Sequence, residues 1–211
     1  RYSALIMFGL VPAALMGVDL NTYLQRTIKF ANQMRPNYPH GRNSGLVLGA
    51  ILGAAYKKGV DKLTILAEEP FRSFGSWMEQ LIAESSGKHG KGIVPVDIEP
   101  FVEGAAYSKD RLFIYLKNDG VFGDFVDGLK KNGAPVLTFD VTSPYDLGAE
   151  FMRWEFATAV ACAVLDVNAF DQPDVQDNKT RTKDKIAAYE ASGVLSEGEA
   201  QFEDDSCRLY W

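Results

Sequence analysis

The sequence predicts an α/β fold: a three-layer αβα sandwich with a mostly parallel sheet, followed by a C-terminal helical arm. Three observations support this class. Short apolar runs occupy the middle of the chain, helical segments lie between several of them, and a polar helix follows the last run. Strands and helices that alternate in this way are typical of a parallel sheet covered on both faces.

Four short apolar runs predict the strands of the sheet. They lie at residues 63–67, 93–98, 112–116 and 136–141, and each is bounded by Gly, Asp, Lys or Pro. Helical segments are predicted between several of these runs, near residues 73–85 and 120–132. Such continuous apolar runs indicate strands that are buried on both faces.

Residues 3–58 precede the first strand and are predicted to form three helices. Apolar residues recur there at three- and four-residue spacing, and the pattern breaks at Gly17, at residues 36–39 and at Gly59.

The most apolar run of the chain, residues 4–18, falls in the first of these helices. It is shorter than the roughly 20 residues that a membrane span needs, and Gly9, Pro12 and Gly17 interrupt it. We therefore expect a buried helix and no membrane partner.

After the last strand, a long helix is predicted near residues 146–165, and a polar helix follows near residues 175–191. The closing stretch from Ser196 is acidic and weakly patterned, which indicates a solvated tail. We divide the chain into a domain at residues 1–145 and an arm with an acidic tail at residues 146–211.

Charge and cysteine content indicate which partners and which cellular compartment to expect. The 211 residues carry a net charge of −6 and no run of Lys and Arg, which argues against nucleic acid. Cys162 and Cys207 offer neither a metal-ligand spacing nor a disulfide framework, so we expect a reducing cytoplasm. The chain begins at Arg1 without an initiator Met or a signal peptide, and we expect it to be a piece of a longer polypeptide.

The segment after the first strand is a candidate binding site, because ligands of open parallel sheets bind beyond the carboxyl ends of the strands. The segment turns at Pro70 and offers Ser73 as a helix N-cap, where free amides could hold an anion. The alternative interpretation is a capped helix without a ligand.

Gln80 and Glu84 lie four residues apart in the helix that follows, so both project from one face, with Ser76 or Trp77 one turn earlier. A carboxylate in this position is a candidate general base. The alternative is a surface Glu beside the helix C-cap at Gly87.

Residues 166–175 contain a second candidate constellation, followed by Lys179. On its own this segment predicts a loop that leads into a helix, with Asp171 as a cap and Pro173 in the first turn. Lys179 by itself is typical of a solvated helix lysine.

Three motifs together resemble glucose-6-phosphate isomerases. They are RYS at Arg1, QLIAESSGK from Gln80, and FDQ at Phe170 with Lys179 nine residues after the Phe. The resemblance covers nearly the whole chain up to about Lys185. The sequence around these motifs is most similar to the isomerase part of bifunctional transaldolase/glucose-6-phosphate isomerase fusions.

This resemblance implies a second sugar-isomerase (SIS) domain of flavodoxin-like architecture plus a C-terminal arm. The family interconverts glucose 6-phosphate and fructose 6-phosphate through a cis-enediol and needs no metal or other cofactor. The implied partners are the sugar phosphate substrate and an N-terminal SIS domain that this sequence lacks. A fused transaldolase domain and a homo-oligomer are left open.

The resemblance also implies roles for single residues. Glu84 would move the proton between C1 and C2, and Arg1 would stabilise negative charge on the enediolate oxygens. Gln80 and Gln172 would hydrogen-bond the sugar or its phosphate. Lys179 would assist ring opening or hold the O1 and O5 end of the substrate.

The sequence departs from the family in two places. The Ser- and Thr-rich phosphate cradle of the first SIS domain is missing, and Ser73, Ser76 and Lys88 are too few to replace it. Ser73 and Lys88 are predicted to bind substrate. The ring-opening histidine is missing as well, since only His40 and His89 occur and His89 is predicted to face solvent in a turn. Either Lys179 or the missing half would then open the ring.

The sequence also allows a second function, that of a non-catalytic SIS module that binds a sugar phosphate as a sensor. It predicts a phosphate site without a positioned carboxylate, whereas the isomerase predicts that Glu84, Arg1 and Lys179 converge in one cleft. A purely structural α/β interaction domain is the third alternative.

Overall fold

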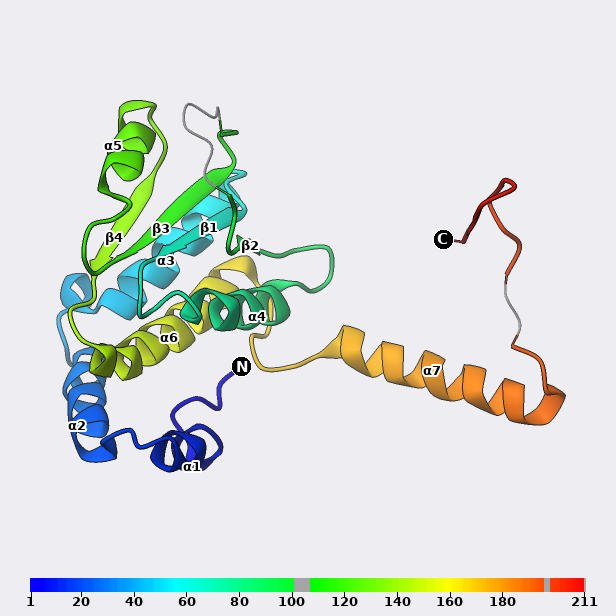
Figure 1. The fold of residues 1–211 in the computed structure, drawn as a ribbon, viewed down its shortest axis with the longest axis horizontal. Coiled ribbons are helices and arrows are strands. Elements are labelled where there is room, and N and C mark those ends of the chain that lie inside the picture. The colour runs from blue at the N-terminus through cyan, green and yellow to red at the C-terminus, as the bar shows by residue number, and fades with distance from the viewer. Residues whose placement is uncertain (101–106, 196–197, 211) are drawn as a thin grey trace. The chain divides into compact units, whose positions relative to one another are not determined.

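A four-stranded parallel sheet forms the centre of the part that spans residues 1–171 (Figure 1), in a computed structural model that describes residues 1–100, 107–195 and 198–210. The strands are β1 (Lys62–Ala67), β2 (Val94–Val96), β3 (Arg111–Lys117) and β4 (Val136–Asp140), in the spatial order β2-β1-β3-β4. All three pairings are parallel. The chain moves outward from β1 to β2 and then, on the other side, from β3 to β4. The direction therefore reverses between β1 and β3, which is where open α/β sheets usually bind ligands.

Helices cover both faces of this sheet. On one face, α3 (Ser44–Lys57), α4 (Phe74–Ser86) and α6 (Leu147–Leu165) share a buried apolar cluster with β1 and β3. On the other face, α5 (Gly123–Lys131) packs against alternate residues of the same two strands. The predicted three-layer sandwich is confirmed, and each predicted strand lies within a few residues of its expected bounds.

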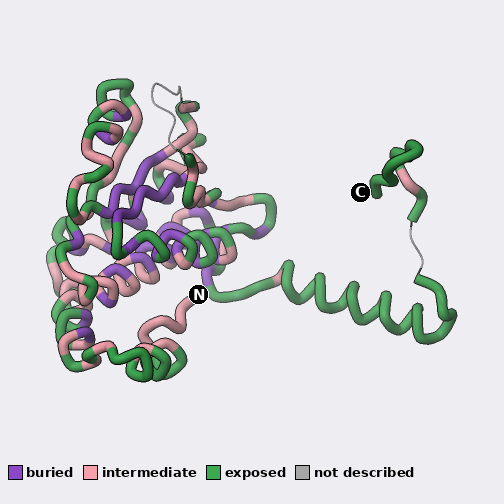
Figure 2. Tube along the Cα trace, viewed as in Figure 1, coloured by how far each residue is buried: buried purple, intermediate pink, exposed green. Residues whose placement is uncertain are grey.

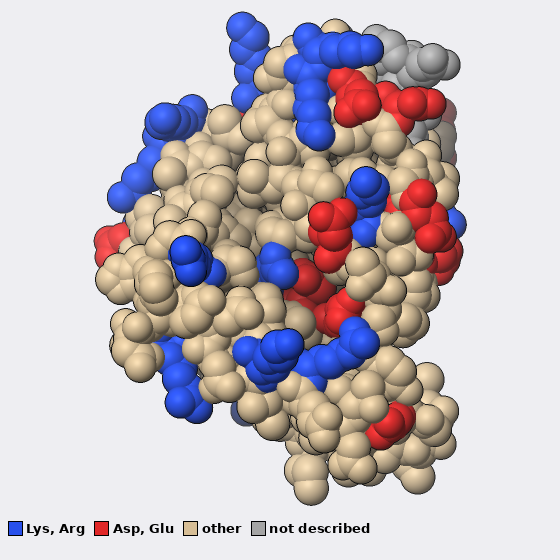
Figure 3. Space-filling view, turned by 90° about the vertical axis from the view of Figure 1, so that its left-hand side faces the viewer, with Lys and Arg blue, Asp and Glu red and all other residues tan. Residues whose placement is uncertain are grey.

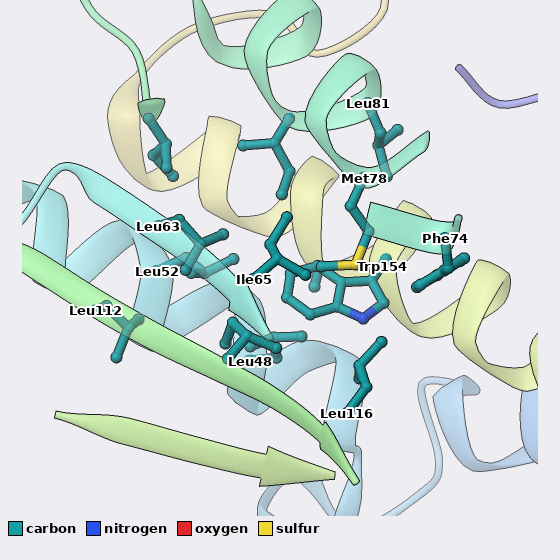
Figure 4. Packing of buried hydrophobic residues seen from close by; sticks show 14 of the residues in the cluster. Leu48, Leu52, Leu63, Ile65, Phe74, Met78, Leu81, Leu112, Leu116 and Trp154 are labelled. Carbon is teal, nitrogen blue, oxygen red and sulfur yellow. The ribbon is translucent and has the colours of Figure 1, made fainter. Parts of the chain in front are cut away.

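The core of the larger face surrounds Trp154 of α6 (Figure 4). Its indole lies beside Met78 from α4 and between Ile65 and Leu116 from the two central strands, and all four side chains are almost fully buried. Burial of an aromatic side chain of this size contributes about 3 kcal/mol to the free energy of unfolding. The core thus fixes α4, and with it the side chains that α4 presents, against the sheet.

Close contact between α3 and α6 explains two glycines in α3. A Cβ at Gly49 would lie 2.5 Å from the carbonyl oxygen of Ala157, and one at Gly53 would lie 2.5 Å from Cβ of Val164. Any larger side chain at either position would push the two helices apart.

The N-terminal segment forms α1 (Met7–Leu15), α2 (Leu20–Ala31) and two short 3-10 helices, η1 (Asn32–Met34) and η2 (His40–Arg42). A third, η3 (Pro144–Asp146), precedes α6. The prediction that the apolar run at 4–18 is buried is wrong for this chain. The structure describes every residue of α1 and none of them is buried, with Phe8 and Leu15 78% and 85% exposed. Apolar residues lie on all sides of α1, so the sequence pattern could not indicate which side, if any, is covered.

None of the helices among the described residues is both long enough and apolar enough to cross a membrane.

The chain divides into two compact units, Arg1–Asp171 and Gln172–Trp211. The second unit consists of α7 (Pro173–Ser192) and a small antiparallel pair, β5 (Phe202–Glu203) and β6 (Arg208–Leu209). Every described residue of α7 except Pro173 is exposed (Figure 2). The division at residues 145 and 146 stays a prediction, and α6, which it assigned to the arm, lies in the first unit.

Residues 198–210 of the acidic tail are exposed as expected, except for the half-buried Ala200, but they are not without structure. The carboxylate of Asp204 accepts hydrogen bonds from the backbone N–H groups of Ser206 and Cys207 at 2.7 and 2.8 Å. This turn joins β5 to β6, whose strands are too short to be predicted from periodicity.

Candidate active site

The C-terminal end of α4 is held in place by Ser86. Its hydroxyl donates to the carbonyl oxygen of Ile82 at 2.7 Å and accepts from the backbone N–H of Ile93 at 2.9 Å. The chain then reverses through a tight turn at residues 88–91, where His89 and Gly90 have φ values of 53° and 72°. Two consecutive residues with positive φ are typical of a two-residue hairpin turn.

Glu84 lies at this end of α4 and contacts Arg1. The Nε atom of Arg1 is 3.4 Å from Oε2 of Glu84, and the side chains are 7% and 30% exposed. Nη1 of Arg1 donates to the carbonyl oxygen of Glu84 at 3.3 Å and to Oγ of Ser85 at 3.2 Å. It also donates to the carbonyl oxygen of Ala169 at 3.0 Å. A nearly buried guanidinium thus lies beside a carboxylate that solvent and ligands can reach.

Tyr2 supports the same arrangement. Its hydroxyl donates to Oγ of Ser85 at 3.3 Å, and its ring lies 5.0 Å from the ring of Phe170. Burial raises the pKa of Tyr2 above its ordinary value. The first residues of the chain are therefore anchored to α4 and to the segment after α6.

Gln80 and Glu84 line one open hollow on the exposed side of α4, together with Ser76, Glu79 and Ala83. The structure therefore places the predicted polar stripe on one face of the helix. An open hollow next to a carboxylate and a guanidinium is suited to a polar ligand such as a sugar.

Ser73 lies at the opposite end of α4. It is the N-cap residue, as predicted, but its side chain makes no capping hydrogen bond and is exposed. Glu84 lies eleven positions after it, or about 16 Å along the helix axis. The structure does not bring Ser73 together with Glu84.

Lys88 is buried, with a side chain that is 2% exposed. Its ammonium donates to the carbonyl oxygen of Asn168. It also donates to the carbonyl oxygen and to Oδ1 of Asp171, both at 2.8 Å. No sequence pattern indicated these partners, because they lie about eighty residues further along the chain.

A second cavity, of about 560 Å³, lies at the carboxyl edge of the sheet where the chain direction reverses between β1 and β3. Figure 3 views the molecule from the side on which these strands end, and acidic side chains gather there with basic ones around a hollow. The cavity is lined by both acidic and apolar residues, which include Glu68, Glu69, Asp97, Glu99, Ile98, Val121 and Phe122.

Glu68 is the most constrained carboxylate of this edge. Its Oε2 accepts from the backbone N–H groups of Asn118, Asp119 and Gly120 at 2.7, 2.6 and 2.9 Å. Its Oε1 accepts from the backbone N–H of Phe122 at 3.2 Å and from the hydroxyl of Tyr115. Burial alone would raise the pKa of Glu68, but these hydrogen bonds outweigh it and lower the pKa to about 2. The sequence directed attention to the segment after this strand, but sequence reasoning gave Glu68 itself no role.

No group of three or more His, Cys, Asp or Glu side chains that could hold a metal ion occurs in the part of the chain that the structure describes.

Curated glucose-6-phosphate isomerases are similar to this chain along most of its length. The protein from Lactobacillus helveticus is 27% identical over 232 residues, which cover 85% of this chain and 49% of the relative. The protein from Methanocaldococcus jannaschii is 25% identical over 219 residues, with coverages of 85% and 54%. The chain resembles glucose-6-phosphate isomerases. It spans about half the length of the curated relatives it matches.

A solved structure has a similar fold. The crystal structure of a hypothetical protein from Thermus thermophilus matches with a TM-score of 0.68 and 22% sequence identity, and covers 88% of this chain and 55% of that one. At this identity the match supports the fold alone. No protein-family model matches the chain.

Several residues that the resemblance to glucose-6-phosphate isomerases singles out lie together in the first unit. Arg1 and Glu84 are in contact, and Gln80 lines the same hollow as Glu84. Gln172 and Lys179 belong to the second unit, where both are exposed, so their roles stay predictions. His89 is exposed in its turn, as expected.

Proposed function

We propose that this chain is part of an aldose–ketose isomerase that interconverts glucose 6-phosphate and fructose 6-phosphate, with Glu84 as the base. One observation supports the proposal above the others. A guanidinium that is 7% exposed lies 3.4 Å from a carboxylate that is 30% exposed, at the edge of an open hollow. Isomerisation through an enediolate needs this pair: a base for a carbon-bound proton and a fixed cation for the oxygen charge.

The chemistry can be followed atom by atom. The carboxylate of Glu84 removes the proton from C2 of open-chain glucose 6-phosphate, and the electron pair of that C–H bond moves to form an enediolate with negative charge on O1. Arg1 stabilises this charge. Glu84 then returns its proton to C1 while the hydroxyl proton of O2 is transferred to O1, so that a carbonyl forms at C2. The step needs no external oxidant or reductant.

Contacts to the substrate would come from the predicted polar residues. Gln80 lines the hollow beside Glu84 and is placed to hydrogen-bond a sugar hydroxyl. Gln172 would bind the sugar or its phosphate, and Lys179 would assist ring opening. Ser73 stays a candidate for a separate anion contact at the other end of α4.

The remainder of the enzyme is also part of the proposal. The curated relatives are about twice as long as the matched region, so the other half would supply an N-terminal SIS domain and the phosphate cradle. We expect the isolated chain to be inactive for this reason. The transaldolase fusion, the homo-oligomer and the cytoplasmic location stay predictions from the sequence.

The decisive experiment compares two substitutions in the longest polypeptide that contains this sequence, which we call the parent protein. Glu84→Gln keeps the shape of the side chain and removes the base. We expect kcat for conversion of fructose 6-phosphate to fall by at least about 100-fold, with binding of the sugar phosphate retained. Glu79→Gln is the matched control, since Glu79 lines the same hollow five residues before Glu84, and it should keep kcat within about twofold.

Two other results would contradict the proposal. If the native parent protein binds sugar phosphate without isomerising it, the sensor function is correct and Glu84 has no proton to move. If Glu84→Gln and Glu79→Gln reduce kcat equally, the base lies elsewhere.

A further inference from the structure

The segment between α6 and the second unit, residues 166–171, is held by cationic side chains from two distant parts of the chain. We call this segment the connector. Arg1 donates to the carbonyl oxygen of Ala169, and Lys88 donates to the carbonyl oxygens of Asn168 and Asp171. Lys91 donates to the carbonyl oxygens of Leu165 and Asp166 at 2.8 and 3.2 Å. Backbone carbonyls of an irregular segment are thus satisfied by side chains rather than by secondary structure.

Lys88 is the most deeply buried of these three cations. Burial of an ammonium is costly unless hydrogen-bond partners surround it, and the three oxygens of Asn168 and Asp171 match its three N–H groups. The ion pair also lowers the pKa of Asp171, chiefly through the hydrogen bond from Lys88. An ammonium in this state has no donor left for a sugar phosphate.

The connector in turn determines where Arg1 lies. Nη1 of Arg1 is shared between Ala169 of the connector and the Glu84–Ser85 end of α4. A shift of Ala169 would therefore move the guanidinium that lies 3.4 Å from the Glu84 carboxylate. A displacement of about 1 Å in such a group can reduce a catalytic rate by about 100-fold.

We propose that Lys88 is a positioning residue, which fixes the connector so that Ala169 holds the guanidinium of Arg1 beside Glu84. This proposal rests on the proposed isomerase function, and it replaces the predicted role of Lys88 in substrate binding. Lys88 acts at a distance from the substrate, through a backbone carbonyl and Arg1.

The kinetic test uses Lys88→Met in the parent protein, which keeps the length of the side chain and removes the ammonium. Because Arg1 is assigned to the charge of the enediolate, we expect kcat to fall about 10-fold or more while KM stays within about twofold. Lys91→Met is the matched control from the same turn, because Lys91 binds carbonyls that do not contact Arg1. It should leave both constants within about twofold. A rise in KM with unchanged kcat would overturn the proposal and restore Lys88 as a substrate contact.

A double-mutant cycle separates positioning from general loss of structure. If Lys88 acts through Arg1, Lys88→Met should lower kcat by less than about twofold when Arg1→Lys is already present. Fully additive losses would show that the two residues act independently. Asp171→Asn removes the charge of the Asp171 side chain and leaves the other contacts between Lys88 and the connector. It should lower kcat by about threefold, and it provides a test if Lys88→Met does not fold.

A measurement without catalysis distinguishes failure of this proposal from failure of the proposed function. Hydrogen exchange of the amides of residues 168–171, the part of the connector that Lys88 binds, should be at least about 10-fold faster in Lys88→Met than in the native protein and in Lys91→Met. Unchanged exchange would overturn the proposal that Lys88 fixes the connector, even if the parent protein is an active isomerase. Faster exchange in a parent protein that does not isomerise would refute the isomerase function and leave Lys88 as the anchor of the connector.

Discussion

The carboxylate of Glu68, at the end of β1, accepts hydrogen bonds from Tyr115 and from four backbone N–H groups of the loop after β3. The carboxylate of Glu84, at the end of α4, lies beside the guanidinium of Arg1 and an open hollow. Glu68 is 4% exposed, whereas the Glu84 side chain is 30% exposed. Glu68 directly follows β1 and Glu84 lies in the last turn of α4, so both are fixed by well-packed elements and differ in the groups that surround the carboxylate.

This difference separates a structural carboxylate from a candidate catalytic one. A carboxylate that is saturated with donors is stabilised as an anion and makes a poor base. Glu68 therefore organises the loop that leads from β3 into α5, although it lies at the edge of the sheet where ligands usually bind. Glu84 retains access to solvent, which proton transfer to a bound sugar requires.

The largest effect is expected when Glu68 is removed. Glu68→Ala leaves four backbone N–H groups and the Tyr115 hydroxyl without their acceptor, so the free energy of unfolding should fall by about 4 kcal/mol. Urea denaturation followed by circular dichroism measures this change. Glu69→Ala is the matched control, because Glu69 is the exposed neighbour, and it should change the free energy of unfolding by less than about 0.5 kcal/mol. Equal losses of stability for both variants would show that the hydrogen bonds of the Glu68 carboxylate do not make it a structural residue.

Acid should abolish the contribution of Glu68. Its pKa is lowered from 4.5 to about 2 in the folded protein, so its stabilisation is complete above the unfolded value and is lost as the pH falls from about 5 towards 2. The loss amounts to about 3 kcal/mol. The stability difference between native protein and Glu68→Ala, measured by denaturation at several pH values, should shrink across this window. A difference that stays constant would contradict the assigned anionic state.

Local features of both sites could be predicted from the sequence. The bounds of α4 and the common face of Gln80 and Glu84 follow from helical periodicity, which involves only residues close in sequence. The contact between Arg1 and Glu84 spans 83 residues, and only the resemblance to known isomerases suggested it. The partners of Lys88 and Glu68 could not be predicted, because they depend on how distant loops meet after the sheet has formed.

The misjudged elements have a similar cause. The apolar pattern of α1 predicts burial but carries no information about what covers it, and the described residues leave Phe8 exposed. The hairpin at β5 and β6 is too short for a periodic signal, although Asp204 two residues before Ser206 is typical of a side-chain-stabilised turn.

Loss of a single donor to Glu68 should have a smaller effect. Tyr115→Phe removes the hydroxyl and keeps the buried ring, so the four backbone donors remain. A hydrogen bond to a charged group contributes about 2 kcal/mol, and the free energy of unfolding should fall by that amount. Thermal denaturation of the variant beside the native protein checks this value. A loss as large as that of Glu68→Ala would mean that the hydroxyl, rather than the backbone cradle, holds the carboxylate.

The smallest effect on stability is expected at Glu84. Glu84→Gln removes one charge from a partly exposed ion pair with Arg1, so the free energy of unfolding should change by less than about 0.5 kcal/mol. The same variant should lose most of its isomerase activity in the parent protein. Denaturation curves and kcat measured on one preparation test both parts together. If Glu84→Gln destabilises the protein by several kcal/mol, its loss of activity has a structural cause, and Glu84 belongs with Glu68 as a structural carboxylate.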